Sequence, residues 1–181
     1  YYKGVTDEGL YRSFSTIIDR VGDRRLRIYL YHIPPVAQVG ISFDLIERLL
    51  RAYPGTVVGI KDSSGDWSHT QELLTRFGDS GFDVFAGSET FLTATLRNGG
   101  AGCISATANV NPSALATLAG RRQTADAAAE QARADVIRGI FQQRPMIAAM
   151  KQAIAHWSGD SAWTRVRPPL VELGPEVAAA L

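Results

Sequence analysis

The segment Val57-Val58-Gly59-Ile60-Lys61-Asp62-Ser63-Ser64-Gly65 decides the fold class of this chain. A short apolar run ends at a lysine and opens into a polar turn, which is typical of a buried strand that reaches the edge of a sheet. The run Leu26-Arg27-Ile28-Tyr29-Leu30 ends in the same way at Tyr31, thirty residues earlier. Two such strands separated by a helical stretch predict a parallel sheet with crossover helices.

Alternating strand and helix patterns continue over most of the chain. Strands are expected at residues 26–31, 56–61, 82–86 and 102–106. Helices are expected at residues 10–21, 43–53, 67–77, 91–96, after Asn111-Pro112, at 125–141, at 145–157 and from Pro175. Ser42 and Asp66 are predicted N-caps, because their side-chain oxygens can accept hydrogen bonds from the amides of a first helical turn.

The spacing of the four strands matches a (β/α)₈ TIM barrel, whose active site gathers at the carboxyl ends of its strands. A doubly wound open sheet has the same local pattern, and periodicity alone does not separate the two α/β folds. In the barrel interpretation, residues 1–120 form the C-terminal half of the barrel, from the end of strand 4 to strand 8. Residues 121–181 then form a C-terminal helical extension.

Composition excludes several classes of protein. The 181 residues are 45% apolar and 20% charged, as in a globular protein with a sizeable core. A net charge of +1 favours neither nucleic acid nor an anionic membrane as partner. No window approaches the ~18 apolar residues of a membrane span. The lone Cys103 excludes an internal disulfide, and together these features predict a cytoplasmic protein with a small substrate.

Lys61 and Tyr31 are the candidate catalytic residues. The carboxyl ends of neighbouring parallel strands meet at one edge of the sheet, so we expect the amine and the phenol to lie side by side. A neutral lysine can attack a ketone to form a Schiff base, and a phenol can carry protons for the intermediates. Because a free lysine has a pKa of ~10.4, this use requires a lowered pKa, which desolvation can supply. The alternative is a solvated lysine at a strand end beside an ordinary amphipathic tyrosine.

Metal and phosphate sites are not predicted. His32, His69 and His156 are scattered in the sequence and are interpreted as structural or solvated side chains. The stretch Gly99-Gly100-Ala101-Gly102 precedes a predicted strand, so it lacks the helix N-terminus that commonly binds phosphate. The sequence therefore predicts chemistry without a metal or an organic cofactor.

A set of motifs resembles one enzyme family in order and spacing. The motifs are Tyr1-Tyr2-Lys3, Glu8-Gly9-Leu10-Tyr11, Tyr31-His32-Ile33-Pro34, the segment from Gly59 to Gly65, Gly87-Ser88-Glu89 and the segment from Gly99 to Asn109. With them the chain resembles the dihydrodipicolinate synthase and N-acetylneuraminate lyase superfamily, the pyruvate-dependent class I aldolases. The resemblance is specific from residue 1 to about residue 112, and looser at Arg167-Pro168-Pro169-Leu170.

The resemblance implies a TIM barrel and a role for each matched residue. Lys61 matches the imine-forming lysine, and Tyr31 matches the tyrosine that shuttles protons. Tyr2 matches a tyrosine that reaches across a dimer interface into the neighbouring site. The matches to substrate contacts are Ser63, Gly87, Ser88 and Glu89, with Ile104 beside the pyruvyl group.

These substrate contacts have simpler alternatives. Ser63 and Ser88 can satisfy the amides of turns, as serine often does. Glu89 can act only as a negative charge that complements a helix dipole. Gly87 can be present only for backbone geometry.

The sequence departs from the family pattern in two respects. The synthases carry an arginine two residues after the proline of the Tyr-x-x-Pro motif, where it binds the carboxylate of the aldehyde partner, and this chain has Val36 there. An apolar side chain cannot pair with a carboxylate, which argues against aspartate semialdehyde as the partner. The family also has the first barrel strands before the position of Tyr1, so we expect the chain to be part of a longer protein.

The combined hypothesis is a Schiff-base lyase, a class I aldolase that cleaves or condenses a 2-keto acid with pyruvate as one component. Dihydrodipicolinate synthase proper is one alternative. A catalytically silent keto-acid-binding protein of the same fold is the other. The resemblance also implies a homotetramer built as a dimer of dimers.

Overall fold

The computed structural model describes residues 3–181, which divide into two compact units. The first unit ends at Ile104, and the second runs from Ser105 to Leu181. Tyr2, the predicted cross-subunit residue, lies outside the described residues. The predicted boundary at residue 120 refers to the complete barrel and stays a prediction.

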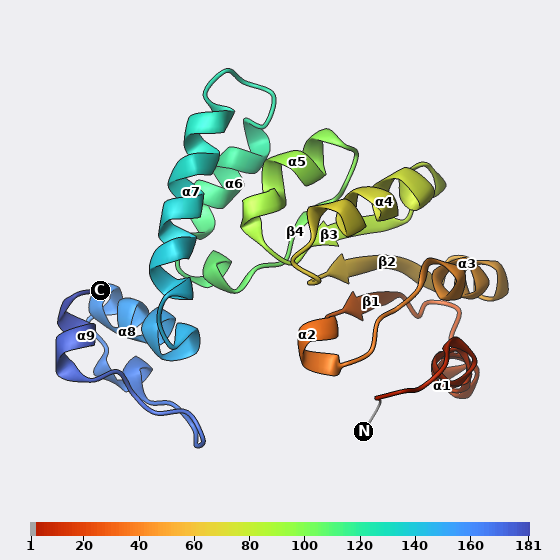
Figure 1. Ribbon diagram of the computed structural model, residues 1–181, viewed down its shortest axis with the longest axis horizontal. Helices are drawn as coiled ribbons and strands as arrows, with labels where there is room; N and C mark the ends of the chain where they lie inside the picture. Colours follow the sequence, from red (N-terminus) through yellow and green to blue (C-terminus); the bar gives the residue numbers. More distant parts are fainter. Residues whose placement is uncertain (1–2) are drawn as a thin grey trace. The chain divides into compact units, whose positions relative to one another are not determined.

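A four-stranded parallel sheet forms the centre of the first unit (Figure 1). Its strands lie side by side in sequence order: β1 (Ile28–His32), β2 (Val57–Asp62), β3 (Asp83–Ala86) and β4 (Gly102–Cys103). The register pairs Tyr31 with Lys61 and His32 with Asp62. The predicted parallel sheet is confirmed, and the two candidate catalytic residues stand at the same level of neighbouring strands.

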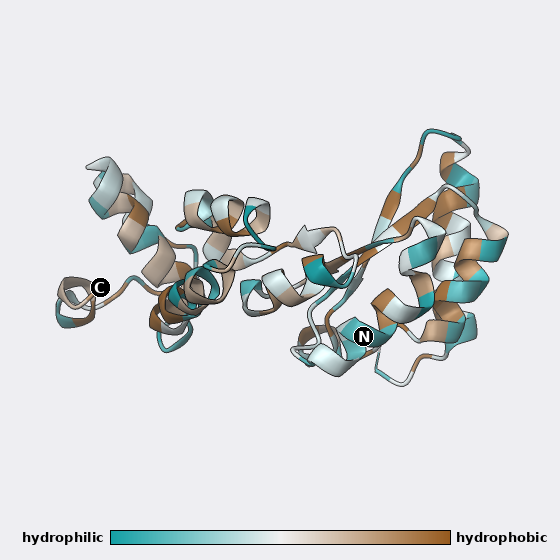
Figure 2. Cartoon of the chain, turned by 90° about the horizontal axis from the view of Figure 1, so that it is seen from above, coloured by the Kyte–Doolittle hydropathy of each residue, from teal (hydrophilic) through white to brown (hydrophobic). Residues whose placement is uncertain are grey.

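Amphipathic helices cover one face of this sheet, which we call the outer face. They include α1 (Asp7–Val21), α3 (Phe43–Ala52) and α4 (Trp67–Phe77). Hydrophobic and hydrophilic residues alternate along these helices, as expected when one side faces a core and the other faces water (Figure 2). The apolar core beneath them consists of Ile18, Leu30, Ile41, Leu45, Ile46, Leu49, Val57, Ile60, Leu73, Leu74, Phe77, Phe82 and Val84. Burying one such large side chain contributes about 1.5–3 kcal/mol.

Two predicted N-caps are confirmed. Ser42 Oγ accepts a hydrogen bond from the Leu45 amide over 3.1 Å. The carboxylate of Asp66 accepts one from the Ser68 amide over 2.9 Å. Each cap satisfies an amide that has no partner within its own helix, and so it fixes the residue at which the helix begins. Helix α4 therefore begins close behind the end of β2.

The chain differs from the sequence prediction at the ends of β1 and β4. After β1 the chain forms a short helix, α2 (Pro34–Ala37), which was not predicted, and its prolines occupy first-turn positions where a missing amide costs nothing. The predicted strand at 102–106 is wrong beyond Cys103, because its neighbour β3 ends at Ala86. The Ala86 carbonyl accepts the last inter-strand hydrogen bond, from the Ile104 amide over 2.9 Å.

The predicted helix at 91–96 starts as a 3₁₀ turn, η2 (Glu89–Phe91), and continues as α5 (Leu92–Arg97). Another 3₁₀ turn, η1 (Gly78–Ser80), follows α4. Both turns lie at helix ends, where the last or first hydrogen bonds commonly tighten to the 3₁₀ pattern.

The second unit is helical. Its elements are η3 (Ala106–Asn109), α6 (Pro112–Gly120), α7 (Ala127–Gln142), α8 (Met146–Ser158), η4 (Ser161–Thr164) and α9 (Pro175–Ala179). The predicted helices at 125–141 and 145–157 are confirmed as α7 and α8. Of their apolar stripes, Phe141 and Met150 are buried in a shared core, whereas Val136 and Trp157 are 66% and 63% exposed. None of the described helices has the length and apolar composition needed to cross a membrane.

Candidate active site

Lys61 and Tyr31 meet on the face of the sheet opposite to the helices, which we call the inner face. Lys61 Nζ donates a hydrogen bond to Tyr31 Oη over 3.1 Å and lies 4.2 Å from the centroid of the tyrosine ring. Tyr31 is 50% exposed, and Lys61 is half-buried. The amine and the phenol are thus in direct contact at the carboxyl ends of β2 and β1.

The contact with Lys61 changes the acidity of the phenol. The hydrogen bond from Lys61 lowers the pKa of Tyr31, burial raises it, and a hydrogen bond with Ser63 lowers it further. The net result is a pKa below the ordinary value of 10.0. A phenol with a lowered pKa exchanges its proton more readily near neutral pH, which is what a proton carrier requires.

A second level of side chains lies beneath this pair on the inner face. Tyr29 Oη donates a hydrogen bond to Asp83 Oδ2 over 2.6 Å, and the tyrosine ring crosses β2 at Gly59. A Cβ atom on Gly59 would lie 2.5 Å from both the Tyr29 ring and the Asp83 carbonyl oxygen. The space that the missing side chain of Gly59 leaves is therefore filled by the aromatic ring of Tyr29.

Gly87 and Ser63 lie against each other just after β3 and β2. The Gly87 amide donates to the Asp62 carbonyl over 2.6 Å, and the Ser63 amide donates to the His32 carbonyl over 2.7 Å. A Cβ atom on Gly87 would overlap Ser63 Oγ and would lie 2.7 Å from the Asp62 carbonyl oxygen. This close approach accounts for a glycine at position 87 without any contact to substrate.

Ser88, Glu89 and Ile104 follow β3 and β4 at the same end of the sheet. Ser88 Oγ accepts a hydrogen bond from the Thr90 amide over 3.2 Å and so caps the turn η2. Glu89 is only 2% exposed, whereas Ile104 is 45% exposed. Their substrate-binding roles, like that of Ser63, stay predictions. Val36, at the position of the family's arginine, is 74% exposed on α2.

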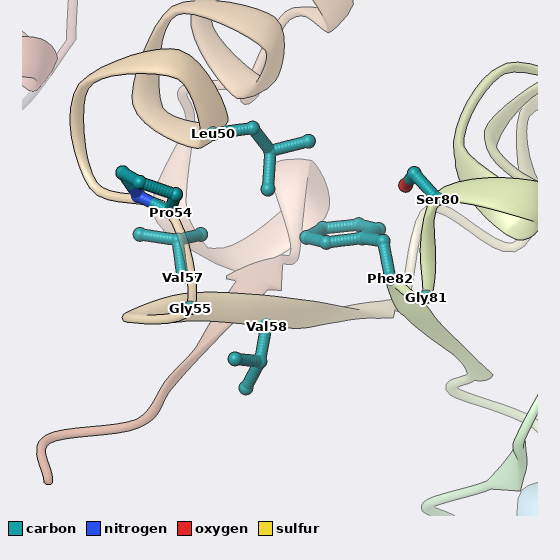
Figure 3. Close-up of a pocket in the computed structure, with 8 residues that line it drawn as sticks. All are labelled: Leu50, Pro54, Gly55, Val57, Val58, Ser80, Gly81 and Phe82. Carbon is teal, nitrogen blue, oxygen red and sulfur yellow. The ribbon is translucent and has the colours of Figure 1, made fainter.

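The pocket drawn in Figure 3 lies at the other end of the sheet. It has a volume of about 310 Å³ and is lined by Leu50, Pro54, Gly55, Val57, Val58, Ser80, Gly81 and Phe82. Val57 is the first residue of β2 and Phe82 precedes β3, whereas Lys61 stands near the carboxyl end of β2. The pocket therefore takes no part in the contact between Lys61 and Tyr31.

Comparison with known proteins identifies the family of this chain. A sequence model of the Dihydrodipicolinate synthetase family matches residues 1–181. The chain belongs to this family. The predicted superfamily is confirmed.

Relatives within the dihydrodipicolinate synthetase family include a DapA-like lyase and several synthases. An uncharacterized DapA-like lyase from Chloroflexus aurantiacus is 34% identical over 182 residues, covering 100% of this chain and 60% of the relative. A 4-hydroxy-tetrahydrodipicolinate synthase from Agrobacterium fabrum is 31% identical over 190 residues, with the same coverage of 100% and 60%. The chain thus spans 60% of the length of these curated relatives.

Solved structures of the dihydrodipicolinate synthetase family confirm the fold. Dihydrodipicolinate synthase from Agrobacterium tumefaciens matches with a TM-score of 0.83 at 35% identity, over 99% of this chain and 60% of that chain. YagE, a prophage protein from E. coli K12 in complex with pyruvate, matches with a TM-score of 0.86 at 28% identity, over 99% and 61%. The predicted C-terminal part of a TIM barrel is therefore confirmed against the open-sheet alternative.

Proposed function

We propose that the protein is a Schiff-base-forming lyase, a class I aldolase that acts on a 2-keto acid with pyruvate as one component. The observation that carries this proposal is the 3.1 Å contact between Lys61 Nζ and Tyr31 Oη. The family supports it, because one relative is named a lyase and the related YagE structure holds pyruvate.

The proposed reaction runs through an imine on Lys61. The neutral Nζ attacks the C2 carbonyl of the keto acid, and loss of water gives an iminium. This iminium accepts the electron pair of the C3–C4 bond as that bond breaks, so an aldehyde leaves and an enamine remains. In this proposal Tyr31, as its phenolate, accepts the proton of the C4 hydroxyl, and the resulting phenol returns a proton to C3. Hydrolysis of the resulting imine releases pyruvate and restores Lys61.

The identity of the aldehyde depends on the residues around the pair. The exposed, apolar Val36 supplies no charge for a second carboxylate, which favours cleavage of a hydroxylated keto acid over condensation with aspartate semialdehyde. The synthase alternative is favoured by relatives named 4-hydroxy-tetrahydrodipicolinate synthase. Turnover of pyruvate with aspartate semialdehyde, compared with pyruvate release from hydroxylated keto acids, separates the two.

We extend the proposal to a dimer of dimers, which sedimentation of the intact protein tests.

Borohydride trapping tests the central step. The chain has three lysines, Lys3, Lys61 and Lys151. Reduction of the intact protein in the presence of pyruvate should attach a three-carbon unit to Lys61. Lys151, whose Nζ lies 5.2 Å from the centroid of the Trp163 ring, is an internal control that should stay unmodified. An unmodified Lys61 rules the mechanism out, and saturable pyruvate binding that survives Lys61→Ala without turnover favours a silent binding protein.

A further inference from the structure

A group of polar side chains lies on the outer face, directly behind Lys61 and Tyr31. Successive residues of a strand point to opposite faces, so Asp62 and His32, which follow the catalytic pair in β2 and β1, point toward the helices. Asp62 is 3% exposed and His32 is 6% exposed. Burying a polar group costs free energy unless hydrogen bonds compensate the loss of water. The hydrogen-bond partners of Asp62 and His32 therefore indicate the role of these two residues.

Asp62 has partners at both carboxylate oxygens. Oδ2 accepts a hydrogen bond from Thr70 Oγ1 over 2.6 Å and lies 3.1 Å from His69 Nδ1. Oδ1 accepts one from the Ser64 amide over 2.9 Å. His69 and Thr70 belong to the beginning of α4, so the carboxylate joins the end of β2 to that helix. Such bonds weaken steeply with distance and angle, so they restrict the position of the strand end.

His32 holds the end of β1 in the same region. Its Nδ1 accepts a hydrogen bond from the Ile41 amide over 3.0 Å. Its ring stacks on His69, with centroids 4.4 Å apart and an interplanar angle of 14°. His69 stacks in turn on Phe43, with centroids 5.1 Å apart. One residue of α4, His69, thus contacts the ends of both strands that carry the catalytic pair.

A metal site does not fit this group. Within residues 3–181, His32, Asp62 and His69 are the one set of three potential ligands whose atoms lie within 4.8 Å of one another. A metal ion lies in the ring plane of each imidazole that binds it, and two stacked, nearly parallel rings share no such position. In addition, His32 Nδ1 is occupied by the Ile41 amide.

We propose that Asp62, Thr70 and His69 are positioning residues for Lys61 and Tyr31. Their contacts on the outer face fix the end of β2, and through His32 the end of β1, so that Lys61 Nζ meets Tyr31 Oη on the inner face. The inference rests on the proposed function, because it assigns these residues to the same reaction. Small displacements of the strand end lengthen the contact between amine and phenol, which lowers kcat. Binding of the keto acid itself is little affected, so KM stays nearly constant.

Substitution of Thr70 tests the inference with little change of shape. Thr70→Val keeps the volume and removes the hydroxyl that donates to Asp62, whereas Thr70→Ser keeps a donor. Thr75→Val is the matched control, because the exposed Thr75 donates to the Gln71 carbonyl of its own helix over 2.9 Å. In the intact native protein we expect Thr70→Val to lower kcat roughly 10- to 100-fold with little change in KM. Thr70→Ser and Thr75→Val should stay close to the unmodified protein.

A second variant covers the case in which Thr70→Val does not fold. His69→Phe keeps a ring between His32 and Phe43 but removes the nitrogen that faces Asp62, so kcat should fall while thermal unfolding still shows a folded protein. If Thr70→Val or His69→Phe is folded and has an unchanged kcat, the inference is overturned. Borohydride trapping at Lys61 would still succeed in that case, so the proposed function would stand. Absence of trapping at Lys61 in the unmodified protein is a different failure, because it removes the proposed function and with it the reaction to be positioned.

Discussion

Lys61 Nζ and Tyr31 Oη lie 3.1 Å apart although thirty residues separate them in the chain. Their contact depends on the register of β1 against β2, because a slip of one residue would turn either side chain to the outer face. The neighbouring residues Leu30 and Ile60 are 2% and 0% exposed in the apolar core of that face. Apolar packing on one face of the sheet therefore enforces the polar contact on the other.

Removal of the phenol hydroxyl should separate imine formation from proton transfer. We expect Tyr31→Phe to lower kcat by roughly 10²- to 10⁴-fold, the usual contribution of a general acid or base. Pyruvate should still become attached to Lys61 on borohydride reduction, because the amine remains. Steady-state kinetics and peptide mapping measure the two effects.

Tyr53→Phe is the matched control for this substitution. Tyr53 Oη lies 3.1 Å from Asp19 Oδ1, at the helices of the outer face, so its loss should leave kcat unchanged. Equal activity of Tyr31→Phe and Tyr53→Phe would contradict the assignment of Tyr31 as the proton carrier.

Substitution of Gly59 should disturb the packing of the Tyr29 ring across β2. A Cβ atom there would lie 2.5 Å from the Asp83 carbonyl oxygen, and backbone cannot move aside as a flexible side chain can. We expect Gly59→Ala to lower the free energy of unfolding by about 1–3 kcal/mol, measured by urea denaturation. Gly139→Ala within α7, where a Cβ atom would meet nothing within 4 Å, should instead raise it by about 0.5–1 kcal/mol. Equal effects of the two substitutions would contradict the close approach of the Asp83 carbonyl and the Tyr29 ring to Gly59.

The sequence was sufficient to predict the parts of the structure that follow local rules. Ser42 and Asp66 start their helices as predicted, because capping depends on a side chain and the amides a few residues away. The placement of Lys61 beside Tyr31 follows from strand alternation and from the meeting of parallel strand ends. The first of these predictions uses only neighbouring residues, and the second uses the general rule for parallel strand ends.

Other features depend on contacts between distant segments and could not be predicted. The length of β4 is set by where β3 ends, and the crossing of Tyr29 to Asp83 is set by the missing side chain of Gly59. The sequence alone predicts only structural or solvated histidines. Strand alternation turns His32 and Asp62 to the face opposite Tyr31 and Lys61, but the contribution of His69 depends on how α4 docks against the sheet.

The role of Ser88 can be decided by comparing two substrates. Its hydroxyl already caps the Thr90 amide, so Ser88→Ala removes a structural bond as well as any substrate contact. Ser88→Asn keeps a capping oxygen and changes the reach of the side chain. If Ser88 contacts the longer substrate portion, both variants should raise KM for a hydroxylated keto acid without changing pyruvate trapping. If Ser88 acts only as a cap, the Asn variant should behave like the unmodified protein in both assays.

Stability should depend on the protonation of His32. Burial lowers the pKa of His32 below its ordinary value of 6.5, the nearby His69 lowers it further, and Asp62 opposes them. The unfolded chain therefore binds a proton at a higher pH than the folded chain, and stability falls as the pH drops below about 6.5 toward the lowered value. Above that window the contribution is fully present, because His32 is neutral in both states.

Thermal unfolding between pH 5 and pH 8 measures this dependence. His32→Asn supplies an oxygen that can accept from the Ile41 amide in place of Nδ1 but does not titrate, so its unfolding temperature should fall less over the acidic part of the range. Asp62 also makes stability fall with falling pH, at lower pH than His32 does. Burial raises the pKa of Asp62, but hydrogen bonds from Thr70, the Ser64 amide and His69 hold the net pKa below its ordinary value. If the unfolding temperature of His32→Asn falls as steeply with falling pH as that of the unmodified protein, groups other than His32 cause the acid sensitivity. The reason is that this substitution removes the ring that takes up a proton on unfolding.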